Sequence, residues 1–368
     1  MHPQTPGQPG SLDLHTPCAI AELPASSQPF APLQQAFVTG ATGLLGNNLV
    51  RALVARGIAV RALARSVDKA RKQFEDLPLV QVVRGDMADV SAFADELHGC
   101  DVVFHAAAYF RDSYKGGRHW AELKRINVDG SAALIAAAHA AGVRRFVQTS
   151  SIAVLDGLPG ALIDETCDRQ PSDADDYYRS KILADEEVRR FVRAHPQMHA
   201  SFVLPGWMWG PGDMGPTSAG QLVNDVARGR LPGLVPGSFS VVDARDVALA
   251  HIAAAERGRQ GERYLAAGRH MVMEELIPLL GEVGGMAVPT RKLPLPVLYV
   301  LAGIQEIYAR LSGKPVLLGL ATVRLMVREA GRTRFNPQKS ERELGLYFRP
   351  VTQTLADTVG WYRSNGWF

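Results

Sequence analysis

Residues 39–46 read Thr-Gly-Ala-Thr-Gly-Leu-Leu-Gly, a glycine-rich turn with the spacing GxxGxxG. The apolar run Ala36–Thr39 precedes the turn, and the helical pattern Asn47–Arg56 follows it. Glycines at these positions let the chain turn tightly and let backbone N–H groups approach a pyrophosphate, whose charge the N-terminus of a helix favours. A strand, a glycine turn and a helix in this order indicate a dinucleotide-binding unit, although a purely structural turn could have the same spacing.

Short apolar runs alternate with longer helical patterns up to residue 204, which is typical of βαβ units joined into a parallel sheet. Six runs are expected to be strands: Ala36–Thr39, Ile58–Ala64, Leu79–Val83, Asp101–His105, Arg144–Thr149 and Ser201–Leu204. The clearest helical patterns are Asn47–Arg56, Asn127–Ala141 and Asp176–Ala194. We therefore predict an α/β protein with a Rossmann-type, doubly wound parallel sheet.

The alternation stops after Leu204, where stretches rich in proline and glycine begin. We expect residues 35–204 to form a nucleotide-binding domain, to which residues 241–267 return. Residues 205–240 and 268–368 are expected to form a smaller C-terminal lobe that closes over the site. Residues 1–34 contain seven prolines and no basic start followed by an apolar run, so we expect a flexible extension rather than a signal peptide.

The composition of the chain indicates which classes of ligand it is not expected to bind. The 368 residues are 46% hydrophobic and 21% charged, as in folded globular proteins. The 40 basic and 37 acidic residues are scattered, which argues against binding of nucleic acid. Neither the ten histidines nor Cys18, Cys100 and Cys167 have metal-ligand or disulfide spacing, so we expect no metal site and a cytoplasmic location.

A membrane span is not expected either. The longest apolar stretch, Leu293–Ile304, has about half of the ~20 residues that a transmembrane helix needs. The segment Leu298–Leu311 is amphipathic and could lie on a membrane surface, but packing against the core is the favoured interpretation.

The end of the second expected strand bears on the choice of cofactor. An NAD-binding protein usually has Asp or Glu about 20 residues after the glycines. Here Ala64 occupies that position, Arg65 follows it, and Lys69 comes soon after. A guanidinium group pairs well with a 2′-phosphate, so NADP(H) is favoured over NAD(H) unless these cations only begin a solvated helix. Asp86 and Met87, after the third strand, are expected to face the adenine.

The stretch Tyr177-Tyr178-Arg179-Ser180-Lys181 contains Tyr-x-x-x-Lys within a helical pattern, and this spacing places the tyrosine and the lysine on one helix face. An ammonium group beside a phenol lowers the pKa of the phenol toward neutral pH, where it can exchange protons. We therefore expect Tyr177, rather than Tyr178, to be the acid or base. Ser151 follows the fifth strand, where its hydroxyl can hold a substrate oxygen that gains charge.

Eight motifs occur in an order that resembles the extended short-chain dehydrogenase/reductase family, which is also the NAD-dependent epimerase/dehydratase family. They are TGATGLLG from Thr39, GDM from Gly85, HAAA from His105, NVDG from Asn127, TSS from Thr149, YYRSK from Tyr177, GPGD from Gly210 and VDARDVA from Val242. The resemblance covers nearly all of residues 35–368. It implies that Asn127 supports the catalytic helix and that the long helices at Asn127 and Asp176 form a homodimer.

The glycine turn, the cations and the resemblance together define the residues expected to bind the cofactor. They are Gly40, Thr42, Gly43, Leu44, Leu45, Gly46, Arg65, Lys69, Asp86, Met87, Ala106, Ala107, Ala108, Thr149, Tyr177, Lys181, Pro205 and Trp207. The expected catalytic residues are Ser151, Tyr177, Lys181 and Asn127.

The kind of substrate is inferred from two positions at which this sequence differs from the nucleotide-sugar enzymes of the family. Leu204 and Trp207 stand where nucleotide-sugar epimerases and dehydratases usually have Arg and Asn, and the surrounding stretch resembles the dihydroflavonol-reductase-like branch. The resemblance therefore favours an apolar or aromatic carbonyl compound or alcohol over a sugar nucleotide. The expected substrate contacts are Tyr109, Ser151, Trp207 and Trp209, although tryptophans of this kind often belong to the core.

Three functions are compatible with these motifs. The leading hypothesis is an NADP(H)-dependent oxidoreductase that transfers hydride between the nicotinamide and a ketone, aldehyde or secondary alcohol. The second is an NAD(P)-dependent sugar epimerase or dehydratase, which recycles the hydride internally. The third is an NADP-binding sensor without catalysis, against which the intact set of Ser151, Tyr177 and Lys181 speaks.

Overall fold

The strands of the central sheet have four to seven residues each, and all except the edge strand Val80–Arg84 are mostly buried. The computed structural model describes residues 30–110, 119–312 and 319–368. The chain divides into two units, Met1–Ala31 and Pro32–Phe368, and all of the described helices and strands belong to the second. Of the expected flexible extension, residues 1–29 lie outside the described residues.

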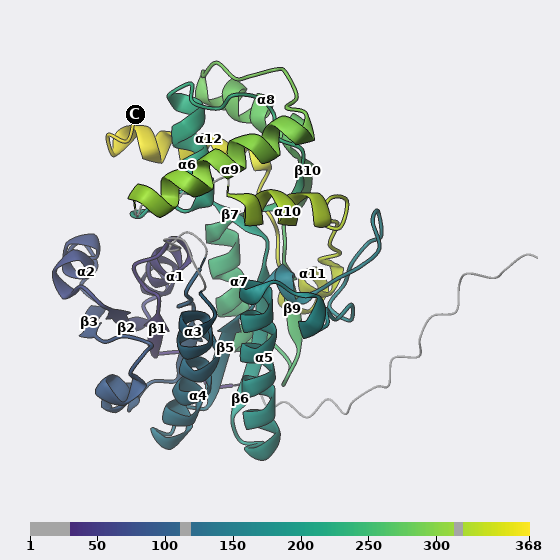
Figure 1. Ribbon diagram of the computed structural model, residues 1–368. Coiled ribbons are helices and arrows are strands. Elements are labelled where there is room, and N and C mark those ends of the chain that lie inside the picture. The colour runs from purple at the N-terminus through teal and green to yellow at the C-terminus, as the bar shows by residue number, and fades with distance from the viewer. Residues whose placement is uncertain (1–29, 111–118, 313–318) are drawn as a thin grey trace, which may run out of the picture. The chain divides into compact units, whose positions relative to one another are not determined.

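Seven parallel strands form the main sheet, in the order β3-β2-β1-β4-β5-β6-β9 (Figure 1). The strands are β1 (Gln35–Thr39), β2 (Ala59–Ala64), β3 (Val80–Arg84), β4 (Val102–His105), β5 (Arg145–Thr149), β6 (His199–Pro205) and β9 (Arg263–Ala266). The first six coincide with the predicted runs to within two residues at each end, and their order is that of a Rossmann sheet. The predicted fold class is confirmed, and β9 is a seventh strand that the sequence did not reveal.

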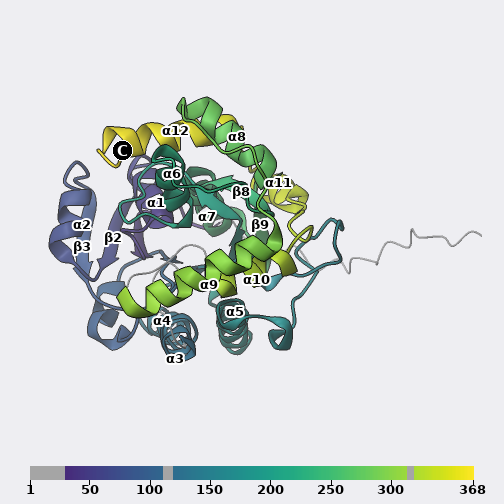
Figure 2. The same ribbon diagram turned by 45° about the horizontal axis from the view of Figure 1, so that its top comes forward.

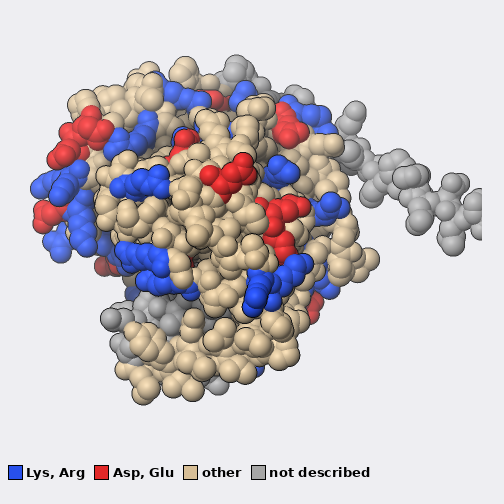
Figure 3. Space-filling view, turned by 90° about the horizontal axis from the view of Figure 1, so that it is seen from above, with Lys and Arg blue, Asp and Glu red and all other residues tan. Residues whose placement is uncertain are grey.

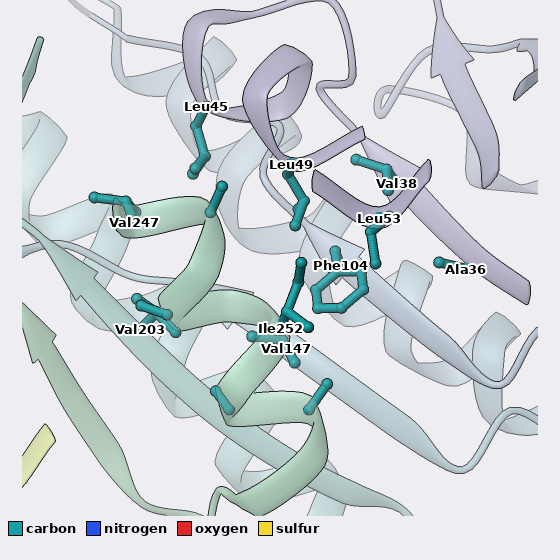
Figure 4. Close-up of a cluster of buried hydrophobic side chains, with 14 of the residues drawn as sticks. Ala36, Val38, Leu45, Leu49, Leu53, Phe104, Val147, Val203, Val247 and Ile252 are labelled. Carbon is teal, nitrogen blue, oxygen red and sulfur yellow. The ribbon is translucent and has the colours of Figure 1, made fainter. Parts of the chain in front are cut away.

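Two layers of helices cover the sheet, because successive side chains of a strand point to opposite faces. Helices α1 (Leu44–Val54) and α7 (Ala244–Arg257) cover one face. There Leu45, Leu49 and Leu53 of α1 pack with strand residues such as Val38 (Figure 4). The other face, which includes Phe37, is covered by η1 (Val90–Leu97), α4 (Gly130–Ala140) and α5 (Asp176–Ala194).

A second, smaller sheet has the order β10-β8-β7, with β7 parallel and β10 antiparallel to β8. Its strands are β7 (Trp207–Trp209), β8 (Ser238–Asp243) and β10 (Arg269–Val272). The helices packed around it are α6 (Ser218–Ala227), α8 (Met273–Gly284), α9 (Leu295–Ser312), α10 (Leu320–Arg328) and α12 (Val351–Ser364). Figures 1 and 2 show these elements gathered above the main sheet, with α9 and α10 side by side.

The small sheet and the helices around it resemble the expected C-terminal lobe. The exact boundaries of that lobe remain a prediction. Helix α7 and strand β9 lie with the main sheet, whereas β8 pairs within the small one. Helix α11 (Gln338–Leu344), which falls in the stretch expected for the lobe, packs against α7 and β9. None of the described helices is both long enough and apolar enough to cross a bilayer.

The helix expected over Asn127–Ala141 has an irregular start. Helix α3 (Trp120–Leu123) passes into a π-helical turn, η3 (Lys124–Asp129), before α4 begins. Turns of this kind are rare and frequently occur at functional sites. The remaining short elements are α2 (Val67–Gln73), η4 (Ile152–Val154) and η5 (Pro171–Asp173).

Candidate active site

The glycine turn between β1 and α1 is packed too closely for larger residues. Gly40 has a φ of +66°, and a Cβ there would lie 2.7 Å from the backbone nitrogen of Ala107. A Cβ on Gly46 would lie 2.1 Å from the carbonyl oxygen of Gly40. The glycines thus allow the start of α1 to approach the end of β4, at the point where the strand order reverses and dinucleotides bind in such sheets.

The N-terminus of α1 is suited to an anion. Gly43 is its N-cap residue, no side-chain hydrogen bond caps the helix, and the first turn has no acidic residue. Uncapped N–H groups at a helix start attract phosphate. Gly40, Gly43, Leu44, Leu45 and Gly46 line a cavity here, so the turn fits the pyrophosphate of a dinucleotide. Thr42 is half-buried in the same turn.

A buried chain of hydrogen bonds joins the ends of β1 and β4 to η3. Thr39 Oγ1 lies 2.7 Å from Nδ1 of His105, and Nε2 of His105 lies 2.9 Å from Ser131 Oγ. The Ser131 hydroxyl donates to the carbonyl oxygen of Asn127 at 2.6 Å, so it accepts from Nε2–H of His105. Burial, together with the charge of Lys181, lowers the pKa of His105 to about 3, and the ring is neutral.

Asn127 uses its whole side-chain amide in hydrogen bonds. Its Nδ2 donates to the carbonyl oxygen of Tyr109 and to Ser180 Oγ, both at 3.0 Å, and its Oδ1 accepts from the Tyr109 N–H at 2.7 Å. Ser180 directly precedes Lys181 on α5. Asn127 is 2% exposed and does not line the cavity, so its geometry suits a residue that positions α5.

Lys181 is buried, and its ammonium group donates to the carbonyl oxygen of Thr149 at 2.6 Å. Burial lowers the pKa of Lys181, and the Asp185 carboxylate, one helical turn further on, partly offsets this. The Thr149 hydroxyl lies 2.7 Å from Nε2 of His251, whose Nδ1 lies 2.8 Å from the Val247 carbonyl oxygen. Burial lowers the pKa of His251 to about 4, so this ring is also neutral.

The two serines after β5 have different partners. Ser150 is buried and donates a short hydrogen bond to Oδ2 of Asp185, whose Oδ1 is buried without a hydrogen-bond partner among the described residues. Burial raises the pKa of Asp185, and the charge of Lys181 opposes this shift. Ser151 is half-buried, lines the cavity and accepts a hydrogen bond from the Ala153 N–H at 3.1 Å. Its own hydroxyl hydrogen is not donated to any described residue, so it is available to a ligand.

Tyr177 and Tyr178 both line the cavity at the start of α5. The ring of Tyr177 meets Phe110 edge to face, with 4.7 Å between the ring centroids. The ring of Tyr178 is covered by the guanidinium group of Arg169, 4.9 Å from its centroid. Only Tyr177 has Lys181 one helical turn after it, so the two tyrosines differ in their electrostatic surroundings.

Arg65 and Lys69 are exposed where β2 ends and α2 begins. Neither forms a hydrogen bond or ion pair with a described residue, and neither lines the cavity. Asp86 is exposed, and its Oδ1 accepts from the Ala88 N–H at 2.9 Å. The Met87 side chain is buried in the core, so only its backbone could contact an adenine.

One cavity of about 1670 Å³ extends from the glycine turn to the small sheet and its helices. Besides the glycine turn, eight residues that were expected at the site line this cavity: Ala106, Ala108, Thr149, Ser151, Tyr177, Lys181, Pro205 and Trp207. Ala107 lies beside it and donates its N–H to Thr39 Oγ1 at 3.2 Å. The far wall is mostly apolar and includes Leu231, Val235, Phe239, Leu293, Leu301, Leu325 and Met326.

The expected substrate contacts separate into two groups. Trp207 lines the cavity, and its Nε1 donates to Ser218 Oγ at 3.1 Å. Trp209 is fully buried behind it, with 4.9 Å between the two ring centroids, and does not line the cavity. Tyr109 also lies off the cavity wall, with its hydroxyl 3.3 Å from Nδ1 of His119. The positions of Trp209 and Tyr109 therefore do not support a contact with substrate.

Sequence reasoning missed the buried groups behind the site. His105, Ser131, His251 and Asp185 were not among the candidate residues, although all four contact or neighbour candidates. Only Asp185 could have been found by spacing, because it follows Lys181 by one helical turn. Among the described residues, no group of His, Cys, Asp and Glu side chains is arranged to hold a metal ion.

Comparison with known proteins identifies similar chains. The model of the NAD dependent epimerase/dehydratase family matches residues 36–267. Sterol demethylase protein B of Methylococcus capsulatus is 34% identical over 334 residues, which cover 89% of this chain and 98% of that protein. A Synechocystis sp. protein named as a dihydroflavonol 4-reductase is 30% identical over 339 residues, with coverage of 90% and 95%.

A solved structure is similar over the same extent. The crystal structure of gox2253 has a TM-score of 0.77 and 32% sequence identity. The match covers 91% of this chain and 99% of that one. The similarity therefore includes both the main sheet and the elements packed around the small sheet.

Proposed function

Since the chain belongs to the NAD-dependent epimerase/dehydratase family of extended short-chain dehydrogenases/reductases, we propose that it is an NADP(H)-dependent oxidoreductase acting on a carbonyl compound or the corresponding alcohol. The observation that carries this proposal is that Ser151, Tyr177 and Lys181 share one cavity with the glycine turn. Catalytic groups at the carboxyl ends of parallel strands, beside a dinucleotide site, are placed for reactions of the nicotinamide.

The proposed roles follow from the hydrogen bonds. NADPH, when bound, supplies a hydride to the carbonyl carbon. Ser151 donates its hydroxyl hydrogen to the carbonyl oxygen, which gains negative charge. Tyr177 gives its proton to that oxygen, so hydride and proton together complete a two-electron reduction, and in the reverse direction the phenolate removes the proton. Lys181, held in place by Thr149, favours the phenolate through its positive charge.

Arg65 and Lys69 support the preference for NADP(H). Both side chains are exposed after β2, where the ribose of a bound dinucleotide would lie. Neither forms a hydrogen bond or an ion pair with a described residue. Ala64 offers no carboxylate to the ribose hydroxyls. A 2′-phosphate would give both cations a partner.

The apolar far wall of the cavity supports an apolar or aromatic substrate, with Ser151 and Trp207 as contacts. The relatives point in the same direction, since one is named for sterols and the other for dihydroflavonols, both of which are polycyclic compounds. Polar residues such as Gln221, Arg228 and Arg230 also line the cavity, so the preference over a sugar nucleotide rests on the predominance of apolar side chains and on the relatives.

The test is to incubate the protein with NADPH or NADH and a panel of polycyclic ketones, and to follow both cofactor absorbance and product formation. We expect NADPH to be consumed in proportion to the alcohol formed, and NADH to be used poorly. Inversion or dehydration of a sugar substrate without net cofactor consumption would instead indicate an epimerase or dehydratase. Binding of NADPH without turnover of any compound would indicate a sensor.

Two further proposals concern the setting of the enzyme. A homodimer through α4 and α5 is what membership of the family suggests. A reducing cytoplasmic location suits Cys100 and Cys167, which are free thiols. Sedimentation equilibrium and fractionation of cells test these two proposals.

A further inference from the structure

A row of apolar side chains runs along the outer face of α9. It consists of Val297, Val300, Ile304, Ile307, Tyr308 and Leu311, which are 44–84% exposed. At about 3.6 residues per turn these positions fall on one stripe, about 20 Å long. We call this stripe the α9 row. Contiguous exposed apolar surface of this kind usually marks an interaction site.

The opposite face of α9 is packed normally. Leu298 and Ala302 are fully buried in the core around the small sheet, so the helix is firmly seated with the α9 row outward. Leu301 and Gln305, between the two faces, line the cavity. Tyr308 belongs to the α9 row and also lines the cavity, so the row borders the place where the cavity reaches the surface.

Exposed cations surround this part of the molecule. Arg291 and Lys292 precede α9, Arg324 and Arg328 lie on the adjoining helix α10, and Arg228 and Arg230 follow α6 and line the same cavity. All six are exposed. In Figure 3 the edge of the molecule along which α9 runs is nearly without charged side chains, and Lys and Arg side chains lie beside it.

Three carboxylates in the same region are less accessible than the cations. Asp225, Glu274 and Glu329 are half-buried and form ion pairs with Arg230, Lys292 and Arg169 respectively. Arg228, Arg291, Arg324 and Arg328 therefore remain as exposed cations without an ion pair among the described residues, whereas Glu275 of α8 is an exposed acid in the same region. An apolar helical stripe flanked by cations is complementary to an anionic bilayer, where lipid tails meet negative headgroups.

We propose that the α9 row is a membrane-contact surface, which places α9 in the plane of an anionic bilayer with the cavity mouth facing the lipid. A second copy of the chain fits less well, because a two-fold axis through the row would bring the same cations of both copies together. Binding to the bilayer does not depend on the reaction. Entry of an apolar carbonyl compound from the lipid rests on the proposed function.

Flotation with vesicles tests the contact. The protein is mixed with vesicles of phosphatidylcholine alone or of phosphatidylcholine with phosphatidylglycerol. We expect binding to the mixed vesicles, weaker binding to the neutral ones, and partial loss of binding at high salt. The variant Ile304→Glu/Ile307→Glu is expected to reduce the partition coefficient by more than about tenfold, because two apolar groups lose their place in the lipid.

The matched control is Leu158→Glu/Leu162→Glu, which alters two leucines, 75% and 64% exposed, on the loop after η4. This control is expected to bind vesicles like the wild type. Leu311→Glu, at the most exposed position of the row, is a second variant in case the double substitution disturbs folding. NADPH binding, measured by fluorescence, should be the same in all of these variants, since none of the altered residues lines the cavity.

Failure of the wild type to bind either kind of vesicle overturns the proposal. So does a loss of self-association in the Ile304→Glu/Ile307→Glu variant without any vesicle binding by the wild type, because the row would then be an interface between copies. If vesicles bind but no carbonyl compound is reduced, the membrane contact stands and the proposed function fails.

Discussion

The ammonium group of Lys181 donates a hydrogen bond of 2.6 Å to the carbonyl oxygen of Thr149, which joins α5 directly to the end of β5. Lys181 forms no ion pair with any residue in the described ranges, so its position is fixed by the strand and not by a carboxylate. This places a buried positive charge one helical turn after Tyr177.

Tyr177→Phe should lower kcat by roughly 10²–10⁴-fold, because it removes a positioned proton donor but leaves the ring in place. Tyr178→Phe, which makes the same change beside it, should leave kcat close to that of the wild type. NADPH affinity should change little in both variants. Steady-state kinetics with an accepted ketone measure the difference, and loss of turnover only in Tyr178→Phe would show that the assignment is reversed.

Arg65→Ala should reduce kcat/KM for NADPH by roughly ten- to a hundredfold, which corresponds to the loss of charge-assisted hydrogen bonds to a 2′-phosphate. The value for NADH should not change, because NADH has no phosphate at that position. Arg144→Ala removes an equally exposed arginine at the opposite end of the strands and serves as the control. Equal use of both cofactors by the wild type would contradict the preference.

The sequence predicted the main sheet because each of its first six strands is a separate apolar run between helical patterns. Strand β9 was not recognised, since Arg263–Ala266 is short and begins with a charged residue. The glycine turn, Ser151 and Tyr177 were predictable together because parallel strands bring the segments that follow them to one edge. The boundaries between the main domain and the smaller lobe were harder to predict. After β6 the chain adds strands to the small sheet, returns to the main sheet with β9 and then goes back to the small sheet with β10.

Contacts between side chains distant in the sequence could not be predicted. The hydrogen bond from Thr149 to His251 spans 102 positions, and its existence depends on how α7 packs against the sheet. The burial of Trp209 could not be predicted from the sequence either. Trp209 shares one face of β7 with Trp207, as residues two apart in a strand do, but Trp207 covers it, so only Trp207 reaches the cavity.

Gly46→Ala should lower the free energy of unfolding by about 1–3 kcal/mol, because the new methyl group would overlap the carbonyl oxygen of Gly40 and force the backbone apart. NADPH affinity should fall with it. Gly360→Ala, in the exposed middle of α12, should instead raise the free energy of unfolding by up to about 1 kcal/mol, since nothing lies near the added group. Denaturant titration of both variants tests this contrast, and equal destabilisation would argue against the close packing at Gly46.

The buried histidines His105 and His251 should make stability depend on pH. Both have pKa values lowered by burial, to about 3 and about 4, whereas an unfolded histidine titrates near 6.5. Below about pH 6.5 the unfolded chain therefore binds protons that the folded chain does not. The free energy of unfolding should fall with decreasing pH, by up to about 1.4 kcal/mol per pH unit for each histidine.

His251→Gln should remove one histidine's share of that slope between about pH 6.5 and pH 4. Its lower stability at neutral pH, caused by lost hydrogen bonds, is a separate effect. His98→Gln makes the same substitution at an exposed position and is the control for effects of the glutamine itself. Denaturant titrations at a series of pH values measure both, and an unchanged slope in His251→Gln would mean that this ring is protonated in the folded protein.

Asp185→Asn should shift the limb of the kcat profile that reports ionisation of Tyr177 to higher pH. The Asp185 carboxylate raises the pKa of the buried Lys181 ammonium, so a neutral amide of the same shape lets Lys181 lose its proton more easily. Once Lys181 is neutral, the phenolate of Tyr177 loses its stabilising charge. Tyr177 would then keep its proton to a higher pH, and alcohol oxidation, which needs the phenolate, would begin only at a higher pH.

Glu186→Gln is the matched control, because it removes the same charge from the next residue of α5, whose side chain is exposed. Water screens that position, so its kcat profile should overlay the wild type. Retention of kcat near the optimum would exclude misfolding of Asp185→Asn, so the position of the limb, and not its height, is the readout. A profile that does not move would mean that Thr149 alone sets the charge state of Lys181, and Asp185 would then have no part in the acid–base chemistry.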